Sequence, residues 1–203
     1  MKFNHILIDT PVIETAHFDG KHFYSINGEK YPSITTILHS FPNKGIEIWK
    51  SKTPNWKDIT DESMMVGTNL HSIIELYLKN ELNIDSIPNH LDSCPDGPIC
   101  VGELFYNIQN ELDKIDNIQA QETRLYHKDL KIAGQVDLIG EYNGEKCIID
   151  FKNSRKSKKE WMVKKSGYYE QLTAYSKMWE YCTDQKIDTG IILIANWDNT
   201  ISI

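Results

Sequence analysis

The stretch Lys131–Lys152 reads KIAGQVDLIGEYNGEKCIIDFK and decides the fold that we expect for this chain. Two runs rich in apolar residues flank the dipeptide Asn143-Gly144. This dipeptide is typical of a two-residue type I′ turn, because both central residues of that turn need a positive φ. We therefore expect a β-hairpin in which Tyr142 pairs with Glu145. Its apolar residues fall on both faces, which is typical of strands that are buried on both sides.

Two acids and a lysine share one face of this hairpin. Counting outward from the turn places Asp137 directly opposite Asp150, and side-chain alternation puts Lys152 on the same face. Opposed side chains have Cβ atoms about 4.5–5.5 Å apart, and opposed like charges destabilise a sheet. Two acids in such a position need a cation between them. A hard divalent ion such as Mg²⁺ suits a few carboxylates plus water.

A carboxylate pair beside a lysine suits metal-assisted hydrolysis of phosphodiester bonds. The metal would polarise the phosphate and lower the pKa of a bound water. Lys152 would orient that water or neutralise the developing charge. The alternative is a solvated hairpin face on which Asp137 and Asp150 are ordinary surface charges. The apolar residues around both acids argue against that alternative.

Bulk properties indicate one globular unit. With 203 residues, of which 40% are hydrophobic, the chain suits a single domain with a sizeable core. We expect an N-terminal meander and helices over residues 1–117 and an αβ core over residues 118–203. The sequence has no apolar run of membrane-spanning length and no signal-peptide pattern, so a cytoplasmic protein without a membrane partner is expected. Four cysteines without a C-x-x-C motif do not favour a metal cluster.

Charge is unevenly distributed along the chain. The net charge of −7 is not the signature of a nucleic-acid binder. One basic run nevertheless begins where the acidic pair ends, and it is able to hold an anionic backbone beside a metal site. The alternative is a solvated loop, as most charge runs are. The basic residues of this run are Lys152, Arg155, Lys156, Lys158, Lys159, Lys164 and Lys165.

Helical spacing predicts two helices before the hairpin, over residues 61–80 and 97–115. In the first, Gly67, His71 and Glu75 form a row beside an apolar stripe. Glycine costs about 1 kcal/mol in a helix interior, so Gly67 suggests close approach of another backbone or a ligand. His71 alone is more often a hydrogen-bonded residue at the edge of a core than a metal ligand.

A further helix is predicted over residues 168–182, again from a regular apolar stripe. Gln171 and Tyr175 lie one turn apart on it and are able to face the site. The alternative for Tyr175 is an ordinary core residue.

Strands and turns complete the predicted order. Turn signals indicate a short meander over residues 17–31, followed by a helix capped by Ser33. Residues 119–127 and 190–197 read as strands. Glu122, in the first of these, is either a third acid of the site or the ion-pair partner of a neighbouring arginine.

Four short motifs occur along the chain in a specific order. They are Tyr31-Pro32-Ser33-Ile34-Thr35, the G-x-x-x-H of Gly67–His71, the pair Gly134-Gln135-Val136-Asp137 and Asp150-Phe151-Lys152, and the Q-x-x-x-Y of Gln171–Tyr175. Each is weak alone, but together they span most of the chain, each on the expected kind of element. In this the chain resembles the PD-(D/E)xK nucleases, in the RecB-like exonuclease branch that includes exonucleases of phages and mitochondria.

The resemblance implies an α/β fold with a restriction-endonuclease-like core, a mixed sheet flanked by helices, behind a helical N-terminal section. It implies that Asp137 and Asp150 bind Mg²⁺ or Mn²⁺ and that Lys152 positions the attacking water. His71, Glu122 and the carbonyl of Phe151 would complete the catalytic and metal-binding set. The residues expected to contact the nucleic acid are Gln171, Tyr175, Ser33, Thr35, Arg155, Lys158 and Lys159.

The implied activity is a metal-dependent DNA exonuclease that acts on free ends, favours single strands and leaves 5′-phosphorylated products. The DNA end would pass through a gap under the N-terminal helices. Relatives with an iron–sulfur cluster carry three cysteines near the C-terminus, where this chain has only Cys182, so no cluster is expected. Without a Walker motif, no ATP requirement is expected either. A phage-encoded protein of this kind would act in the cytoplasm of the host cell.

Two alternatives remain open at this point. One is a nucleic-acid-binding module for recombination or packaging with little cleavage, and the other is a structure-specific endonuclease on the same core. The complete set of Asp137, Asp150 and Lys152 disfavours the first, and the G-x-x-x-H and Q-x-x-x-Y motifs disfavour the second. Protein partners are not indicated by the sequence.

Overall fold

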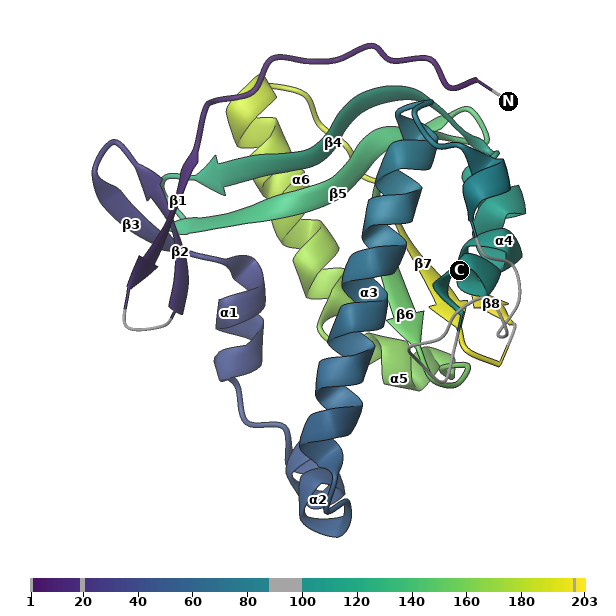
Figure 1. The fold of residues 1–203 in the computed structure, drawn as a ribbon. Coiled ribbons are helices and arrows are strands. Elements are labelled where there is room, and N and C mark those ends of the chain that lie inside the picture. The colour runs from purple at the N-terminus through teal and green to yellow at the C-terminus, as the bar shows by residue number, and fades with distance from the viewer. Residues whose placement is uncertain (1, 19–20, 88–99, 199) are drawn as a thin grey trace.

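The computed structural model describes residues 2–18, 21–87, 100–198 and 200–203. The first regular secondary structure along the chain is a three-stranded antiparallel meander (Figure 1). Its strands are β1 (Glu14–Phe18), β2 (Lys21–Ile26) and β3 (Glu29–Pro32). Asn27 and Gly28 join β2 to β3 with φ values of 51° and 79°, as a type I′ turn requires. The predicted meander is confirmed, although it starts at Glu14 rather than at residue 17.

Helices follow the meander. They are α1 (Ile34–Ser40), α2 (Lys44–Lys52), α3 (Trp56–Leu78), the 3-10 helix η1 (Ile84–Ser86) and α4 (Val101–Leu112). Ser33 caps α1 as predicted, because its Oγ accepts a hydrogen bond of 3.0 Å from the backbone N–H of Thr36. Helix α3 begins five residues before the predicted helix. Its first turns are partly exposed and carry no apolar stripe from which a helix would have been predicted.

A mixed five-stranded sheet occupies the second half of the chain. Its strands, in spatial order, are β4 (Ile115–His127), β5 (Ile132–Tyr142), β6 (Glu145–Ser154), β7 (Gly190–Asn196) and β8 (Ile201–Ser202). Only β6 and β7 run parallel, and the other neighbours are antiparallel. Two helices, α5 (Glu160–Lys164) and α6 (Tyr168–Thr183), connect β6 to β7. Part of the basic run is therefore the short helix α5.

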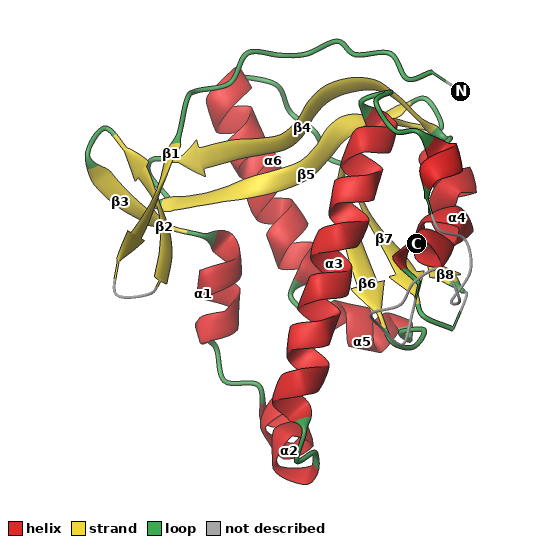
Figure 2. Ribbon diagram, in the orientation of Figure 1, coloured by secondary structure: helices red, strands yellow, loops and turns green. Residues whose placement is uncertain are grey.

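Helices cover both faces of this sheet, as Figure 2 shows. Helices α3 and α4 pack on one face, where Leu70, Phe105 and Ile149 belong to one buried cluster. Helix α6 packs on the other face, where Trp179, Ile148 and other residues form a second cluster. This arrangement is a mixed α/β fold consistent with a restriction-endonuclease-like core, as predicted. None of the helices in the described ranges is both long enough and apolar enough to cross a membrane.

The central hairpin has the predicted register. Tyr142 pairs with Glu145, and pairing continues outward to Leu138 and Ile149. It stops there, one position short of the predicted pair of aspartates. Beyond that pair, the backbone N–H of Phe151 donates a hydrogen bond to the side chain of Asp137.

Candidate active site

Acidic residues occupy neighbouring positions on three adjacent strands. On β4, the pairs Gln121–Leu138 and Thr123–Val136 flank Glu122 and place it opposite Asp137 of β5. Glu122 has a φ of 47°, in the left-handed region that is uncommon for residues other than glycine. Regular pairing is interrupted here. Backbone conformations of this kind concentrate at functional sites.

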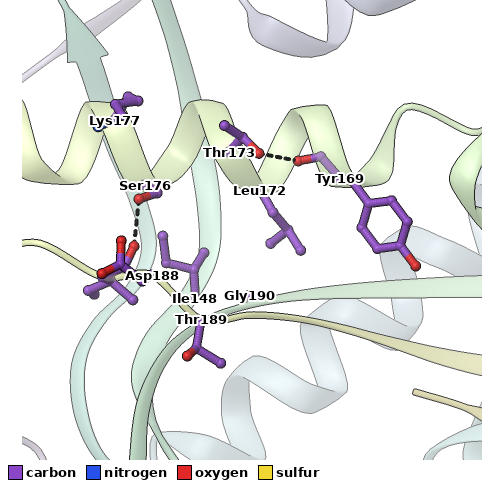
Figure 3. A pocket seen from close by; sticks show the side chains of 10 residues that line it. Ile148, Tyr169, Leu172, Thr173, Ser176, Lys177, Asp188, Thr189 and Gly190 are labelled. Atoms are coloured by element: carbon purple, nitrogen blue, oxygen red, sulfur yellow. Dashed lines mark hydrogen bonds between the residues drawn. The ribbon is translucent and has the colours of Figure 1, made fainter.

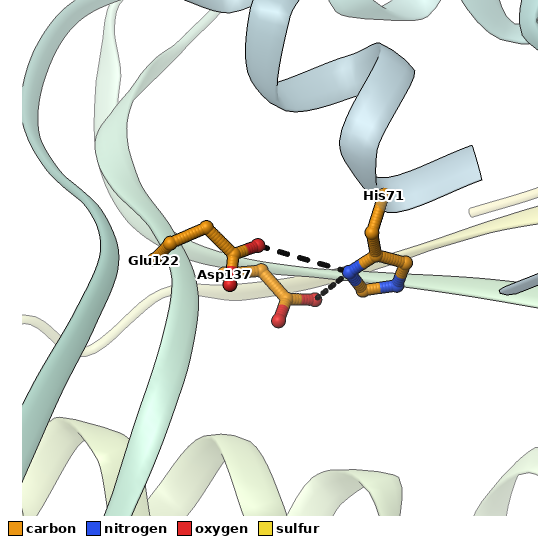
Figure 4. Close-up of side chains that lie close together, drawn as sticks. All are labelled: His71, Glu122 and Asp137. Atoms are coloured by element: carbon orange, nitrogen blue, oxygen red, sulfur yellow. Dashed lines mark ion pairs between the residues drawn. The ribbon is translucent and has the colours of Figure 1, made fainter. Parts of the chain in front are cut away.

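His71, Glu122 and Asp137 form a compact group of possible metal ligands among the described residues (Figure 4). One donor atom of each lies within 4.8 Å of the others. Nδ1 of His71 is 3.8 Å from Oε1 of Glu122 and 3.8 Å from Oδ2 of Asp137. These distances leave room for an ion between donors. Imidazole nitrogen and carboxylate oxygen are donors that divalent cations accept in proteins, so the residues fit such a group.

The backbone of Phe151 joins this group to the next strand. Its N–H donates a hydrogen bond of 2.8 Å to Oδ2 of Asp137. Its carbonyl oxygen is 2.9 Å from Nε2 of His71. When Nε2 donates to this carbonyl, Nδ1 faces the two acids and, in the neutral imidazole, carries the free lone pair. Such a hydrogen bond commonly fixes the tautomer of a ligating histidine.

Burial and neighbouring charges shift the titration of this group. Burial raises the pKa of Asp137 to about 7, and the nearby Asp150 adds to this shift. Burial alone would lower the pKa of His71, but the carboxylates of Glu122 and Asp137 outweigh it and raise the value to about 9. Burial would raise the pKa of Glu122, yet His71 and Gln135 hold it below its usual value. The group therefore attracts positive charge.

Asp150 and Lys152 form a second, adjoining part of the site. Asp150 is fully buried, and its Oδ2 makes an ion pair with the ammonium of Lys152. Nε2 of Gln171 donates to Oδ1 of Asp150 at 3.0 Å and also lies 3.0 Å from the hydroxyl of Tyr175. Burial raises the pKa of Asp150 despite the nearby Lys152. The predicted alignment of Gln171 and Tyr175 with the acids is observed.

Two glycines permit close packing around the site. A Cβ at Gly134 would lie 2.8 Å from Cε1 of Tyr175, so the motif glycine lets the tyrosine ring pack on β5. A Cβ at Gly67 would lie 2.7 Å from Nδ2 of Asn153. The sequence suggested a backbone or a ligand at Gly67, and the structure instead has the Asn153 side chain there. This contact sets helix α3 close to β6, one turn before His71.

The predicted substrate-contacting residues differ in what they touch. Oγ of Ser33 is 2.9 Å from Oγ1 of Thr35, so both hydroxyls are engaged at the start of α1. Arg155 pairs with Glu62 of α3, and its guanidinium lies 4.3 Å from the ring centre of Trp197. It thus ties two elements together.

The remaining two predicted contact residues are lysines. Lys158 donates a hydrogen bond of 2.9 Å to the hydroxyl of Tyr168, whereas Lys159 is exposed.

The sequence left the roles of Gln135 and Tyr168 unassigned. Tyr168 accepts the hydrogen bond from Lys158. Nε2 of Gln135 donates a hydrogen bond of 2.6 Å to Oε2 of Glu122, which helps to hold this acid toward His71. Gln135 stands in the Gly134–Asp137 motif, so a signal was present. Glu122 itself contacts His71 and Gln135 rather than an arginine, because the guanidinium of Arg124 donates to the carbonyl of Ile13.

A pocket lies away from these residues, between α6 and the segment that leads into β7 (Figure 3). Its lining includes Tyr169, Leu172, Ser176 and Asp188. None of the predicted site residues contributes to it. The acids, the histidine and the lysine described above therefore remain the candidate site.

The mixed sheet, with acids on the three adjacent strands β4, β5 and β6, is consistent with a restriction-endonuclease-like core. No protein-family model matches the chain. The chain is similar to mitochondrial genome maintenance exonuclease 1 of Mus musculus, with 29% identity over 137 residues, covering 63% of this chain and 38% of the relative. The Homo sapiens protein of that name is 23% identical over 181 residues, 83% of this chain and 50% of the relative.

A shorter match to the Xenopus tropicalis protein of the same name has 35% identity over 52 residues, which is 26% of this chain and 15% of the relative. The chain spans half or less of the length of these three relatives. Their shared name supports an exonuclease family, in agreement with the motif resemblance.

Proposed function

We propose that this chain is a metal-dependent DNA exonuclease of the PD-(D/E)xK type. The observation that carries the proposal is the meeting of Glu122, Asp137 and Asp150, from three adjacent strands, with His71 and Lys152. The name of the similar proteins supports an exonuclease within that type.

In this proposal the cation, Mg²⁺ or Mn²⁺, is held by Asp137, Glu122 and His71, with Asp150 and the carbonyl of Phe151 at the same site. When bound, it supplies Lewis acidity toward the scissile phosphate and offsets the charge of the acids. The crowding of these carboxylates supports the assignment, since like charges this close repel without a cation.

Lys152 orients the attacking water and stabilises the charge that develops on the phosphate. Its ammonium is held by Asp150, which in turn is held by Gln171. Because both partners are largely buried, the lysine is positioned before substrate arrives. Tyr175 supports Gln171 from the core side.

The substrate in this proposal is DNA with a free end, with single strands favoured, and the products carry 5′-phosphates. Lys158 and Lys159 contribute positive charge beyond the site. Ser33, Thr35 and Arg155 remain candidate contacts at the start of α1 and at the end of β6.

We further propose that residues 1–203 act as one nuclease domain. Helix α3 supplies His71, and the strands supply the acids. The packing supports this, because Leu70 and Ile74 of α3 share one buried cluster with Leu138 and Ile149 of the sheet.

A cleavage assay tests the proposal directly. The substrates are end-labelled linear single-stranded and double-stranded DNA and a covalently closed circle, each with and without Mg²⁺ or Mn²⁺. We expect metal-dependent loss of linear DNA, an intact circle and no activity in Lys152→Ala. Cleavage of the circle would instead establish an endonuclease, and binding without any cleavage would establish a binding module.

A further inference from the structure

The basic run contains one lysine whose surroundings differ from those of its neighbours. Lys152 pairs with Asp150, Arg155 with Glu62 and Lys164 with Glu160. Lys158 instead donates its hydrogen bond to a neutral phenol, the hydroxyl of Tyr168. Within the described part of the chain, no carboxylate forms an ion pair with it. Its ammonium is therefore held in place while its charge remains available to a ligand.

Tyr168 connects this lysine to the candidate site. The ammonium of Lys152 lies 5.4 Å from the centre of the Tyr168 ring, and the ammonium of Lys158 lies 4.9 Å from it. Both cations thus border one aromatic ring. Gln171, three residues further along α6, donates to Asp150. The ring of Tyr168 is accordingly part of the wall of the site.

We propose that Lys158 and Tyr168 form a subsite for a backbone phosphate that neighbours the phosphate beside Lys152. Consecutive phosphates of a strand are closely spaced, and two cations on one ring match such a series. A half-buried ammonium in a fixed position forms a charge-assisted hydrogen bond to phosphate with less loss of side-chain entropy. Tyr168 is a positioning residue in this subsite. This inference rests on the proposed nuclease function and assigns part of its substrate-binding surface.

The test uses single-stranded oligonucleotides in which one phosphate at a time is replaced by a neutral methylphosphonate. The KM and kcat for cleavage of the neighbouring bond are measured for the full chain. We expect wild-type KM to rise roughly tenfold for one position of the neutral linkage, a typical effect of losing a contact to a charged group. In Lys158→Ala, KM for the unmodified strand rises by a similar factor, and the neutral linkage at that position has no further effect.

Lys156→Ala is the matched control, because it removes the same charge from an exposed position two residues away. It should keep the position-dependent loss seen in the wild type. Tyr168→Phe retains the ring and removes only the acceptor for Lys158, and it should weaken the dependence on that phosphate without abolishing it. A Lys158→Ala variant that remains as sensitive to the neutral linkage as the wild type would overturn the subsite. Absence of cleavage in the wild type would instead contradict the nuclease function.

Discussion

Two charged regions lie next to each other in this molecule and are built differently. In the candidate site, acids and cations are largely buried and each contacts more than one other group. In the basic segment, residues 155–165, most charges are exposed, and some contact a single nearby residue, as Lys164 contacts Glu160 and Lys165 contacts Trp161. The charged groups of the site are His71, Glu122, Asp137, Asp150 and Lys152.

The difference sets the size of the effects expected from substitutions. Exposed ion pairs contribute about 0–1 kcal/mol each, because water and salt screen them. Buried charges interact more strongly and depend on every partner. Substitutions in the site should therefore change chemistry and stability by large factors. Substitutions in the basic segment should change the affinity for DNA by small factors.

Asp150→Ala should show the largest effect. It removes the acid that holds Lys152, and we expect cleavage to fall on the order of a thousandfold, comparable with the loss of a main charge-stabilising group. Binding of single-stranded DNA, measured by fluorescence anisotropy, should survive. Asp150→Asn is the size-matched control for folding, because its amide oxygen is still able to accept from Gln171. Full activity in Asp150→Ala would contradict the assignment of the site.

Gln171→Ala should have the next largest effect. The substitution leaves Oδ1 of the buried Asp150 without its 3.0 Å hydrogen bond and frees the hydroxyl of Tyr175. Residues that orient a ligating or catalytic group typically account for about 10- to 100-fold in activity or metal affinity. Cleavage rates across a Mg²⁺ titration would measure both. Thr173→Ala, on an exposed face of the same helix, is the control, and equal effects of the two would show that α6 acts only as a scaffold.

Stability of the metal-free protein should depend on pH through Asp137. Its folded-state pKa is about 7 and its ordinary value is 3.8, so the folded state binds more protons between these values. The free energy of unfolding therefore falls as pH rises through this window, because the folded state gains a buried charge. Asp137→Asn should remove this part of the slope.

Thermal unfolding in a chelator between about pH 4 and 8 measures this, with a difference of a few degrees expected between wild type and variant. Mg²⁺ should reduce the wild-type slope, since a cation favours the ionised acid. Parallel pH profiles of wild type and Asp137→Asn without metal would contradict the interpretation.

Much of the geometry of the candidate site was predictable, because the periods of strands and helices are regular. The Asn143-Gly144 turn fixed the hairpin register, and alternation then placed Asp150 and Lys152 together. The i, i+4 spacing of neighbours on a helix likewise aligned Gln171 with Tyr175. The position of Glu122 was not predictable in this way. Its left-handed backbone interrupts the pairing that the alternation rule assumes.

In the basic segment, periodicity does not predict which partner each side chain contacts. In the sequence, these residues form one group only because all of them are positively charged. In the structure, they differ in the residues that they contact. Arg155 lies between Glu62 and Trp197, whereas Lys158 contacts Tyr168. Such pairings depend on how α3 and α6 pack against the sheet, which short-range sequence patterns do not encode.

Substitutions of Arg155 and Lys159 should have the smallest effects, and the comparison of the two is the most discriminating. Arg155 bridges α3 to the ends of β6 and β7 through Glu62 and Trp197, so Arg155→Ala should lower thermal stability by a few degrees, about 1 kcal/mol. Lys159 is exposed, so Lys159→Ala should leave stability unchanged. Each lost phosphate contact to single-stranded DNA lowers the slope of log K against log salt by about 0.7. We expect that change, at most, for Lys159→Ala and a smaller one for Arg155→Ala. The reverse pattern would mean that Arg155 leaves Glu62 to bind the DNA strand. Arg155 would then belong to the substrate-binding part of the site rather than to the basic segment.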